Sequence, residues 1–377
     1  MTRAAFVHPA DIDNCHYPPD CPFRSERAGE TRRLLASTGL LSGAGRREVS
    51  PPPAGRGVLE TFHTRPYLAV LERASGGELE VEGLHMGLGT PETPVFLGLY
   101  ECAALACGAT LAGAQLILDG EVEVAFNPSG GFHHAHASQA SGFCYLNDVV
   151  LGCARLAAAG RRVLFLDIDV HHCDGVQDAF YDRSDVFVMS FHETGRLLFP
   201  GTGFEDDVGV GAGAGYTANV PLPAGLYDEA FLEAFRAVGV PLIRAYAPDV
   251  IVLELGMDGL SGDPLAHQNL TNNAYADLIG EVLGFARPVL ATGGGGYHVG
   301  NTVRGWALAW RILCGQQQGA DEMGLGLGGV LMETTDWPAG LRDRALVPDD
   351  RQRAEVDAAV AATIEKVKAS VFAYHGL

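Results

Sequence analysis

The chain has 377 residues, of which 47% are hydrophobic, and a formal net charge of -20 from 26 basic and 46 acidic side chains. A surface that binds nucleic acid without sequence preference needs clustered Lys and Arg, so this charge argues against a direct nucleic-acid partner. The eight cysteines form no CxxC pair, His8 and Pro9 interrupt any signal-like run, and no stretch approaches the roughly 18 uninterrupted apolar residues of a membrane span. We therefore expect a soluble, reduced, cytoplasmic protein with no membrane partner, whose oligomeric state is unknown.

Short apolar runs alternate with longer helical patterns along the chain, which predicts an α/β fold. In chain order the predicted elements are a helix over 95–120, a strand over 122–126, a helix over 148–159, strands over 163–170 and 186–191, an irregular glycine-rich segment over 195–215, a helix from about 228, strands over 250–255 and 288–292, a helix after 301 and a tail helix over about 355–374. We expect Pro241 to kink or end the helix that contains it. No low-complexity linker divides these elements, which predicts a single domain, residues 1–377.

Four of the predicted strands end in polar, glycine-rich loops. The loops read "NPSGGFHHAH", "HHCDG", "GMDG" and "GGGGYH". In open α/β sheets, ligands bind beyond the carboxyl ends of the strands, where such loops gather. The sequence therefore predicts that six side chains distant along the chain are neighbours in space: His133, His134, Asp169, His171, Asp258 and Tyr297.

The stretch "VLFLDIDVHHCDGV", residues 163–176, indicates a metal site. Asp167, Asp169 and His171 share one side of the predicted strand, and three ionisable groups on one buried face are costly unless a cation or hydrogen bonds satisfy them. Asp169 and His171 are spaced to converge on one ion, and Asp258 is the best candidate for a third ligand. Two Asp and one His with a position left open are typical of a catalytic zinc site. The alternative for any one of these residues alone is a capping aspartate or a core histidine.

His133 and His134 follow a Gly-Gly turn. With three metal ligands supplied from elsewhere, both imidazoles are free for proton transfer, and Asp167 and Asp174 are the carboxylates left to orient them. The four residues thus divide into two dyads, although either histidine alone could be a metal ligand or a core residue. Two further histidines are assigned structural roles: His136 and His172.

Tyr297 follows a run of four glycines, which lets the backbone approach a ligand closely or adopt positive φ. A phosphate-binding loop is disfavoured because the GK[ST] of a P-loop is missing and a tyrosine stands in place of a helix start. The phenol is instead a candidate hydrogen-bond donor to an oxyanion that forms opposite the metal.

These motifs resemble those of the zinc-dependent histone deacetylase family in the arginase/deacetylase superfamily, including bacterial class I-like members of the acetoin-utilisation type and acetylpolyamine amidohydrolases. The matching stretches are "GGFHHAHASQASGFCYLNDVVLG", "LFLDIDVHHCDGVQDAFY", "SFHETGRLLFPGTG", "GYTANVPLP", "LELGMDGLSGDPL" and "TGGGGYHVGNTVRGW". With "HPADIDNCHYPP" and "SERAGETRRLL" near the N-terminus, they cover most of the chain in the family's order. The resemblance implies a three-layer αβα fold with a central, mostly parallel sheet and an active site at the carboxyl ends of the strands.

The resemblance also implies roles for individual residues. It implies one Zn2+ per chain, with Fe2+ as an alternative, bound by Asp169, His171 and Asp258. The catalytic residues it implies are His134 as general base and then acid, backed by Asp174; His133 as electrostatic partner, paired with Asp167; and Tyr297, which polarises the amide oxygen. The substrate-binding residues it implies are Gly142, Phe143 and Phe199 in a narrow apolar tunnel, Leu265 and the acidic Glu92 at its rim, and Arg27 beneath the pocket floor. The structural K+ or Na+ sites it implies lie near Asp167, Asp169, His171, Ser190 and Phe191, and near Phe180, Arg183, Val186 and Tyr216.

Two positions depart from the family pattern. Cys173 stands where the family usually has Gly, and we expect a tolerated small residue there rather than a group next to the metal. Pro91 stands where an aromatic residue often precedes the acidic rim residue Glu92.

The activity implied is zinc-dependent amide hydrolysis that removes acetyl or other acyl groups from lysine side chains of proteins, giving a carboxylate and a free amine. An acetylated polyamine is the alternative substrate; the tunnel residues and Leu265 favour protein acyl-lysine, and no long dimerisation insertion is evident. Two other classes are disfavoured. An arginase-like hydrolase would need a two-manganese set with DxHxD spacing, and a non-catalytic acyl-lysine binding module would be expected to have lost Tyr297 or a ligand.

Overall fold

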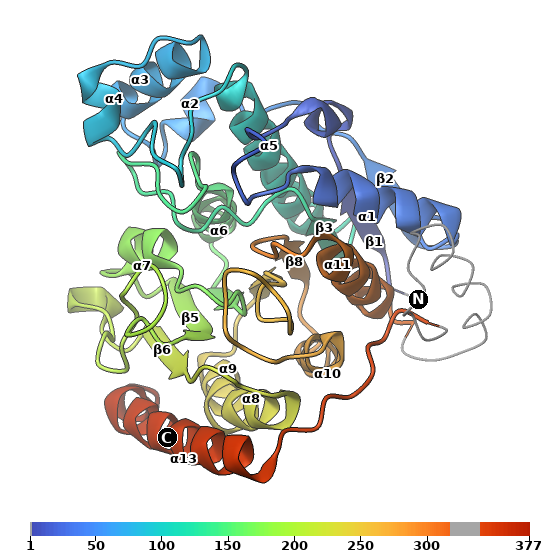
Figure 1. Ribbon diagram of the computed structural model, residues 1–377, viewed down its shortest axis with the longest axis vertical. Coiled ribbons are helices and arrows are strands. Elements are labelled where there is room, and N and C mark those ends of the chain that lie inside the picture. Colours follow the sequence, from blue (N-terminus) through green and yellow to red (C-terminus); the bar gives the residue numbers. More distant parts are fainter. Residues whose placement is uncertain (1, 317–339) are drawn as a thin grey trace.

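A parallel sheet of eight strands forms the centre of the structure, a computed structural model that describes residues 2–316 and 340–377 (Figure 1). The strands are β1 (Ala4–Val7), β2 (Arg46–Val49), β3 (Val124–Asn127), β4 (Val163–Asp167), β5 (Val186–Glu193), β6 (Thr217–Leu222), β7 (Val250–Glu254) and β8 (Val289–Thr292). Their order is β2-β1-β3-β8-β7-β4-β5-β6, and every neighbouring pair is parallel. The carboxyl ends of all these strands therefore lie at the same end of the sheet.

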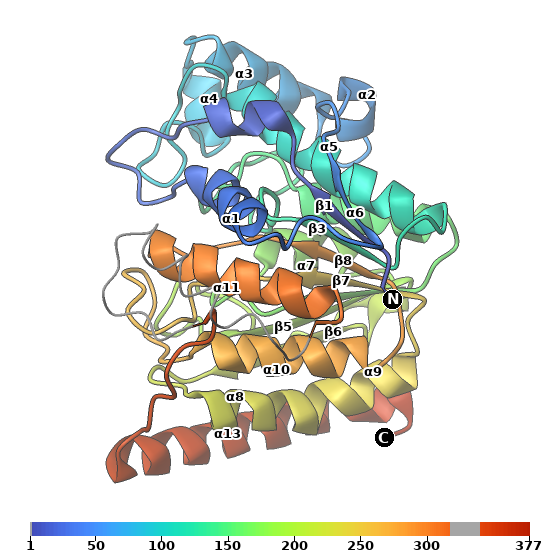
Figure 2. The same ribbon diagram turned by 90° about the vertical axis from the view of Figure 1, so that its right-hand side faces the viewer.

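Helices cover both faces of the sheet, which confirms the expected three-layer arrangement. On one face lie α5 (Leu99–Leu118), α6 (Asp148–Ala158) and α7 (Asp174–Phe180). On the other lie α1 (Glu26–Ser37), α8 (Asp228–Ala234), α9 (Val240–Tyr246), α10 (Asn272–Leu283), α11 (Val299–Leu313) and α13 (Asp350–Val371), most of which Figure 2 shows one below another. The shorter helices α2 (Arg56–Leu59), α3 (Arg65–Ser75) and α4 (Val81–His85) gather beyond α5.

Each strand buries both of its faces, because alternate side chains point to opposite sides of the sheet. In β4, Leu164 and Leu166 belong to the hydrophobic core under α8 to α11, whereas Val163 and Phe165 belong to the core under α5 and α6. All four side chains are fully buried. A strand covered on both sides needs a nearly continuous apolar run, which is why β4 was recognisable in the sequence.

By length and composition alone, α5 is apolar enough to cross a membrane. A criterion of uninterrupted apolar residues does not detect it, because Glu101 and Gln115 interrupt the run. In the structure α5 packs against α6 and β3, and 56% of its most apolar window is buried inside the protein. These contacts are those of a core helix.

The elements differ from the sequence prediction in three ways. The strands β1, β2 and β6 and the helices α1 to α4, α7 and α10 were not predicted. The strand β4 ends at Asp167, so the loop after it, rather than the strand itself, carries the next polar residues. The helix from residue 228 continues past Pro241, because a π-helical turn over Phe235–Gly239 leads into α9 and places the proline in the first turn of α9, where a missing N–H is tolerated. The single-domain assignment stays a prediction.

A buried polar row crosses the sheet near the carboxyl ends of six strands. Its members are aligned in register from strand to strand: Asn127, Thr292, Glu254, Asp167, Ser190 and Asn219. All six are at most 1% exposed. Buried polar groups need partners, so this row marks the level at which the apolar core gives way to polar chemistry.

A disulfide joins Cys15, which follows the short 3-10 helix Ala10–Asn14, to Cys102 of α5. The two Cα atoms are 5.7 Å apart although the residues are 87 positions apart in sequence. The expectation of a fully reduced chain is therefore not met at this pair. No spacing rule could predict the bond, because only the packing of the N-terminal segment on α5 brings the two sulfurs together.

Candidate active site

Asp169, His171 and Asp258 form a compact buried cluster at the carboxyl end of the sheet. Asp169 and His171 lie in the loop after β4, and Asp258 lies in the loop after β7, the strand next to β4. His171 Nδ1 is 2.9 Å from Asp258 Oδ2 and 3.2 Å from Asp169 Oδ1. One ligand atom from each residue lies within 4.8 Å of the other two. The sequence predicted these three residues as neighbours, and the structure brings them together.

The electrostatics of the cluster call for a cation. Burial, together with the charge on Asp169, raises the pKa of Asp258 to about 7. Burial opposes charge on His171, but its hydrogen bonds to both carboxylates raise its pKa to about 10. Two buried carboxylates thus compete for the single positive charge that His171 can supply. The backbone also leaves room only for glycine beside them, since a Cβ on Gly295 would lie 1.9 Å from Asp258 Oδ2.

His133 and His134 form the two predicted dyads. His133 Nδ1 is 2.8 Å from Asp167 Oδ2, and His134 Nδ1 is 2.7 Å from Asp174 Oδ1. The two imidazoles meet through their Nε2 atoms at 3.0 Å. Both rings are buried, His133 on the β4 side and His134 beside the helix that begins at Asp174.

The two histidines have opposite electrostatic surroundings. Burial opposes charge on His133, but Glu254, Asp167 and Asp169 together raise its pKa well above the usual value. Burial and the neighbouring His133 lower the pKa of His134 to about 4. At neutral pH, His133 therefore carries both ring protons, and His134 is neutral with a lone pair on one nitrogen. Groups whose surroundings separate their pKa values in this way are suited to different roles in acid–base chemistry.

Tyr297 lies next to the cluster, at the end of the glycine run after β8. Its ring is 6.3 Å from that of His171 and 5.6 Å from that of Phe143. Burial and the charges of Asp258 and Asp169 raise the pKa of Tyr297 well above its usual value. The phenol therefore stays protonated and can donate a hydrogen bond.

Aromatic rings lie next to the cluster. Phe199 lies 5.0 Å from His134 and 6.3 Å from His171, between ring centroids. Gly142, with φ of 49°, could not carry a side chain, because a Cβ would lie 2.5 Å from the ring of His134. The structure thus places Gly142, Phe143 and Phe199 together around the candidate site.

The two predicted rim residues lie in loops near these rings. The carbonyl of Glu92 accepts a 3.0 Å hydrogen bond from the N–H of Phe143, and the side chain of Glu92 is exposed. Leu265 is half-buried, and its N–H donates to Asp263 Oδ1 at 2.9 Å. Asp263 Oδ2 in turn accepts from the N–H of Tyr297.

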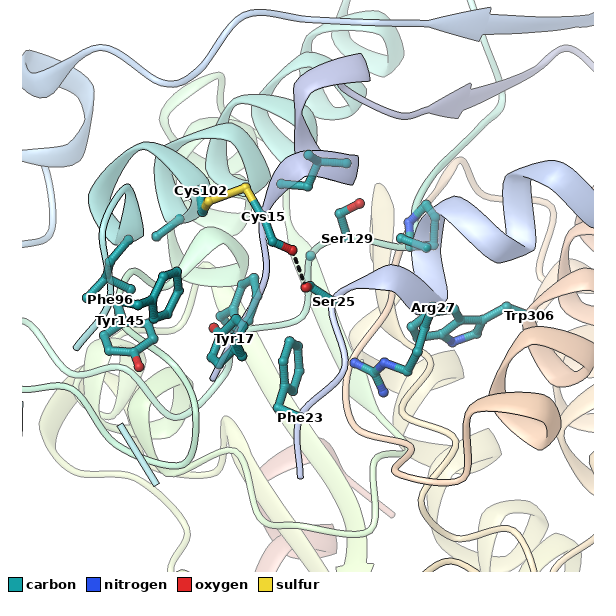
Figure 3. Close-up of a pocket in the computed structure, with 17 residues that line it drawn as sticks. Cys15, Tyr17, Phe23, Ser25, Arg27, Phe96, Cys102, Ser129, Tyr145 and Trp306 are labelled. Atoms are coloured by element: carbon teal, nitrogen blue, oxygen red, sulfur yellow. Dashed lines mark hydrogen bonds between the residues drawn. A yellow bond between two sulfur atoms is a disulfide. The ribbon is translucent and has the colours of Figure 1, made fainter. Parts of the chain in front are cut away.

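Arg27 lies behind the glycine run that leads to Tyr297. Its guanidinium donates to the carbonyls of Gly294 and Gly296 at 3.0 and 2.5 Å. It lies between the rings of Trp306 and Phe23, 5.0 and 4.6 Å from their centroids, at one end of a small cavity of about 30 Å³ (Figure 3). Arg27 is therefore buried behind the segment that carries Tyr297.

The residues predicted for two cation sites lie in separate regions. Asp167 is in register with Ser190 on β5, close to the Asp–His–Asp cluster. In the second group the Arg183 guanidinium is 5.1 Å from the ring centroid of Phe180 and forms an ion pair with Asp185.

Two residues with structural assignments lie beside the site. His172 shares hydrogen bonds with Thr202 and Gln177, in keeping with a structural role. Cys173 is fully buried among Val176 and Phe180 in an apolar core, and burial raises the pKa of its thiol. Its side chain thus packs as a small hydrophobic residue.

Three acidic or basic side chains near the site were missed by the sequence analysis or, in the case of His136, given only a structural role. Glu254 of β7 is fully buried, with Oε1 3.0 Å from His133 Nδ1. Asp263 holds Tyr297 as described, and His136 lies between two carboxylates of α7. Only a tertiary arrangement reveals them, although a Glu in the apolar run "VIVLEL" was a visible signal.

Comparison with known proteins identifies relatives of this chain. The histone deacetylase domain family matches residues 21–313. Histone deacetylase RPD3 of Saccharomyces cerevisiae is 39% identical over 315 residues, which cover 82% of this chain and 72% of the relative. The acetoin utilization protein AcuC of Bacillus subtilis is 37% identical over 327 residues, 85% of this chain and 84% of AcuC.

A solved structure shares the fold. The crystal structure of an HDAC homolog complexed with SAHA superposes with a TM-score of 0.84 at 32% identity, over 98% of this chain and all of that one.

Proposed function

Because this chain belongs to the histone deacetylase family, and is therefore a deacylating hydrolase, we propose that it is a zinc-dependent enzyme that removes acetyl groups from lysine side chains of proteins. The observation that carries the proposal is the convergence of a buried Asp–His–Asp cluster with two His–Asp dyads at one end of the sheet. The products are a carboxylate and a free amine. An acetylated polyamine is the competing substrate.

Zinc fits the cluster of Asp169, His171 and Asp258. Two carboxylate oxygens and one imidazole nitrogen form a donor set that zinc accepts, and Fe2+ accepts as well. The excess of buried negative charge and the glycine beside Asp258 support a cation there. When bound, zinc supplies Lewis-acid polarisation of the acyl carbonyl and lowers the pKa of a water molecule.

His134 moves the proton in this mechanism. Its Nδ1–H donates to Asp174, which leaves Nε2 as an acceptor, and it is neutral at neutral pH. His134 therefore takes a proton from the attacking water and later gives it to the leaving amine. His133, with protons on both nitrogens, stabilises negative charge that develops nearby and points its Nε2–H at His134.

Tyr297 stabilises the reacting carbonyl oxygen. Its phenol keeps its proton and lies beside His171. A donor aimed at a developing oxyanion contributes about 3 kcal/mol to catalysis. The rings of Phe143 and Phe199 exclude water around the acylated alkylamine chain, and Glu92 offers a charge at the rim for the substrate backbone or for a cationic substrate.

The remaining assignments belong to the same proposal. Leu265 forms part of the rim, and Arg27 fixes the glycine run from beneath through its two carbonyl hydrogen bonds. The proposal includes structural K+ or Na+ ions at the two predicted groups of residues. It also includes a cytoplasmic location.

The test is a side-by-side assay of acetyl-lysine peptides, longer acyl-lysine peptides, acetylspermidine and acetylputrescine with zinc-loaded protein. We expect the acetyl-lysine peptides to be hydrolysed best and Tyr297→Phe to lower kcat/KM by roughly a hundredfold or more. A strong preference for an acetylpolyamine would overturn the substrate assignment. Equal inactivity of both proteins on every amide would overturn the hydrolytic mechanism.

A further inference from the structure

His136 lies between two carboxylates of α7, just outside the candidate site. Its Nε2 is 3.5 Å from Asp174 Oδ2, and its Nδ1 is 3.1 Å from Asp178 Oδ2. The two aspartates are four positions apart, so they share one face of the helix. The imidazole therefore bridges both across one helical turn.

Asp174 is the carboxylate behind His134. Its Oδ1 accepts from His134 Nδ1 at 2.7 Å and from the N–H of Gly175 at 3.0 Å. Its Oδ2 faces His136. Asp174 thus lies between two imidazoles, one facing the site and one facing outward.

The surroundings of His136 favour its charged form. Each ring nitrogen faces a carboxylate oxygen, so both nitrogens serve as donors only when both carry a proton. The close contacts with the carboxylates of Asp174 and Asp178 raise the pKa of His136 to about 10. Asp174 correspondingly stays ionised, since His134 and His136 outweigh the effect of burial and hold its pKa well below the usual range.

We propose that His136 is a positioning residue for deacetylation, whose imidazolium holds Asp174 so that Oδ1 keeps His134 in the Nδ1–H tautomer, with the lone pair on Nε2. This inference rests on the proposed function, in which His134 is the base. His136 acts through Asp174 and touches no substrate.

The backbone around His136 is held by other contacts. Asn147 Nδ2 donates to the carbonyls of His133 and Ala135 at 3.2 and 2.9 Å. Gly175 packs so closely on this segment that a Cβ there would lie 2.6 Å from the Ala135 carbonyl oxygen. The segment is thus fixed to α7 without the His136 ring, which leaves the charge beside Asp174 as the contribution specific to that ring.

The test compares His136→Gln, which keeps hydrogen bonding but no charge, with His136→Lys, which restores a cation. We expect His136→Gln to lower kcat roughly tenfold with KM nearly unchanged, and His136→Lys to keep kcat within about threefold of the wild type. Thermal unfolding of each variant shows whether it is folded. A wild-type kcat in His136→Gln, or equal losses in both variants, would overturn the proposal.

A second readout does not depend on turnover. Long-range 15N–1H spectra of histidine-labelled, zinc-loaded protein report the tautomer of each ring. We expect His134 to be the Nδ1–H tautomer in the wild type and in His136→Lys, and a mixture of tautomers in His136→Gln. An unchanged His134 tautomer in His136→Gln would refute the positioning role. Wild-type protein that is inactive on every acyl substrate would refute the proposed function instead, while the spectra would still decide the role of His136.

Discussion

The backbone N–H of Tyr297 donates a 2.7 Å hydrogen bond to Oδ2 of Asp263, which is 9% exposed. The other oxygen of the same carboxylate accepts from the N–H of Leu265. One side chain therefore joins the segment that carries the phenol to the segment at the rim.

Replacing Asp263 by Asn should weaken catalysis without loss of metal. The amide has a single acceptor oxygen, whereas the carboxylate accepts from the N–H groups of Leu265, Tyr297 and His298, so at least one N–H loses its partner, which costs about 1–3 kcal/mol when the group is buried. We expect kcat to fall roughly tenfold, because the phenol is no longer held in place. Steady-state kinetics and zinc analysis measure both effects, with the exposed Asp277→Asn as control. Unchanged kcat in Asp263→Asn would show that Tyr297 is held by other contacts.

Replacing Asp258 by Asn should release the metal. The substitution removes one of the two carboxylates that face His171, and with it the charge that most favours a divalent cation. We expect bound zinc to fall from one per chain to a small fraction after dialysis, and the melting temperature to become independent of added zinc. Elemental analysis checks this, with the exposed Asp277→Asn as control. Full zinc occupancy in Asp258→Asn would place the metal elsewhere.

The titration of His63 should make the folded state less stable in acid. Its buried Nε2 accepts from the N–H of Asn147 at 2.9 Å, and burial lowers its pKa to about 4. Above pH 6.5 the His63 imidazole is neutral in both the folded and the unfolded chain. As the pH falls, the imidazole gains its proton first in the unfolded chain. The stabilisation is therefore complete above about pH 6.5 and declines towards pH 4, with a loss of roughly 2 kcal/mol at pH 5.

Urea unfolding of the wild type and of His63→Gln at pH 7.5 and pH 5 isolates this effect. The variant lacks the titrating ring, so the difference in unfolding free energy between the two proteins should narrow by about 2 kcal/mol at pH 5. The other buried histidines affect both proteins alike. A difference that does not change with pH would mean that His63 is protonated as easily in the folded chain as in the unfolded one.

The Cys15–Cys102 disulfide should be measurable by thiol counting and by stability. Without reductant, denatured protein should show the six free thiols Cys21, Cys107, Cys144, Cys153, Cys173 and Cys314. A cross-link over 87 residues restricts the unfolded chain, and its loss should lower the unfolding free energy by roughly 4.6 kcal/mol on a chain-entropy basis. Cys102→Ser tests this, with Cys314→Ser as control. Eight free thiols in unreduced protein would exclude the bond.

The sequence could predict the part of the site that depends on strand ends. Apolar runs such as 163–167 identify buried strands, and in a parallel sheet the loops after them meet at one end, so the strand pattern alone was enough to group Asp169, His171 and Asp258. β6 escaped prediction because it contains Pro221 and polar side chains. β1 has the same length as β3 and β8, which were predicted, so its length does not explain why it was missed.

Other features depend on packing between distant segments and left no local pattern. His136 gains two carboxylate partners only because α7 packs on the loop after β3. Likewise the sequence shows Glu254 as an acid in an apolar run, but not that His133 lies 3.0 Å away. The roles assigned to these residues remain predictions that the substitutions above address.

The strand β8, which comes last in chain order, lies between β3 and β7 rather than at an edge of the sheet. The histidines follow β3, whereas the Asp–His–Asp cluster follows β4 and β7, and β3 does not pair with β7 directly. A nascent chain that ends before residue 289 thus carries every proposed metal ligand and both histidines, yet lacks the strand that joins the two halves. We therefore expect the active site to assemble only after residues 289–297 have been synthesised.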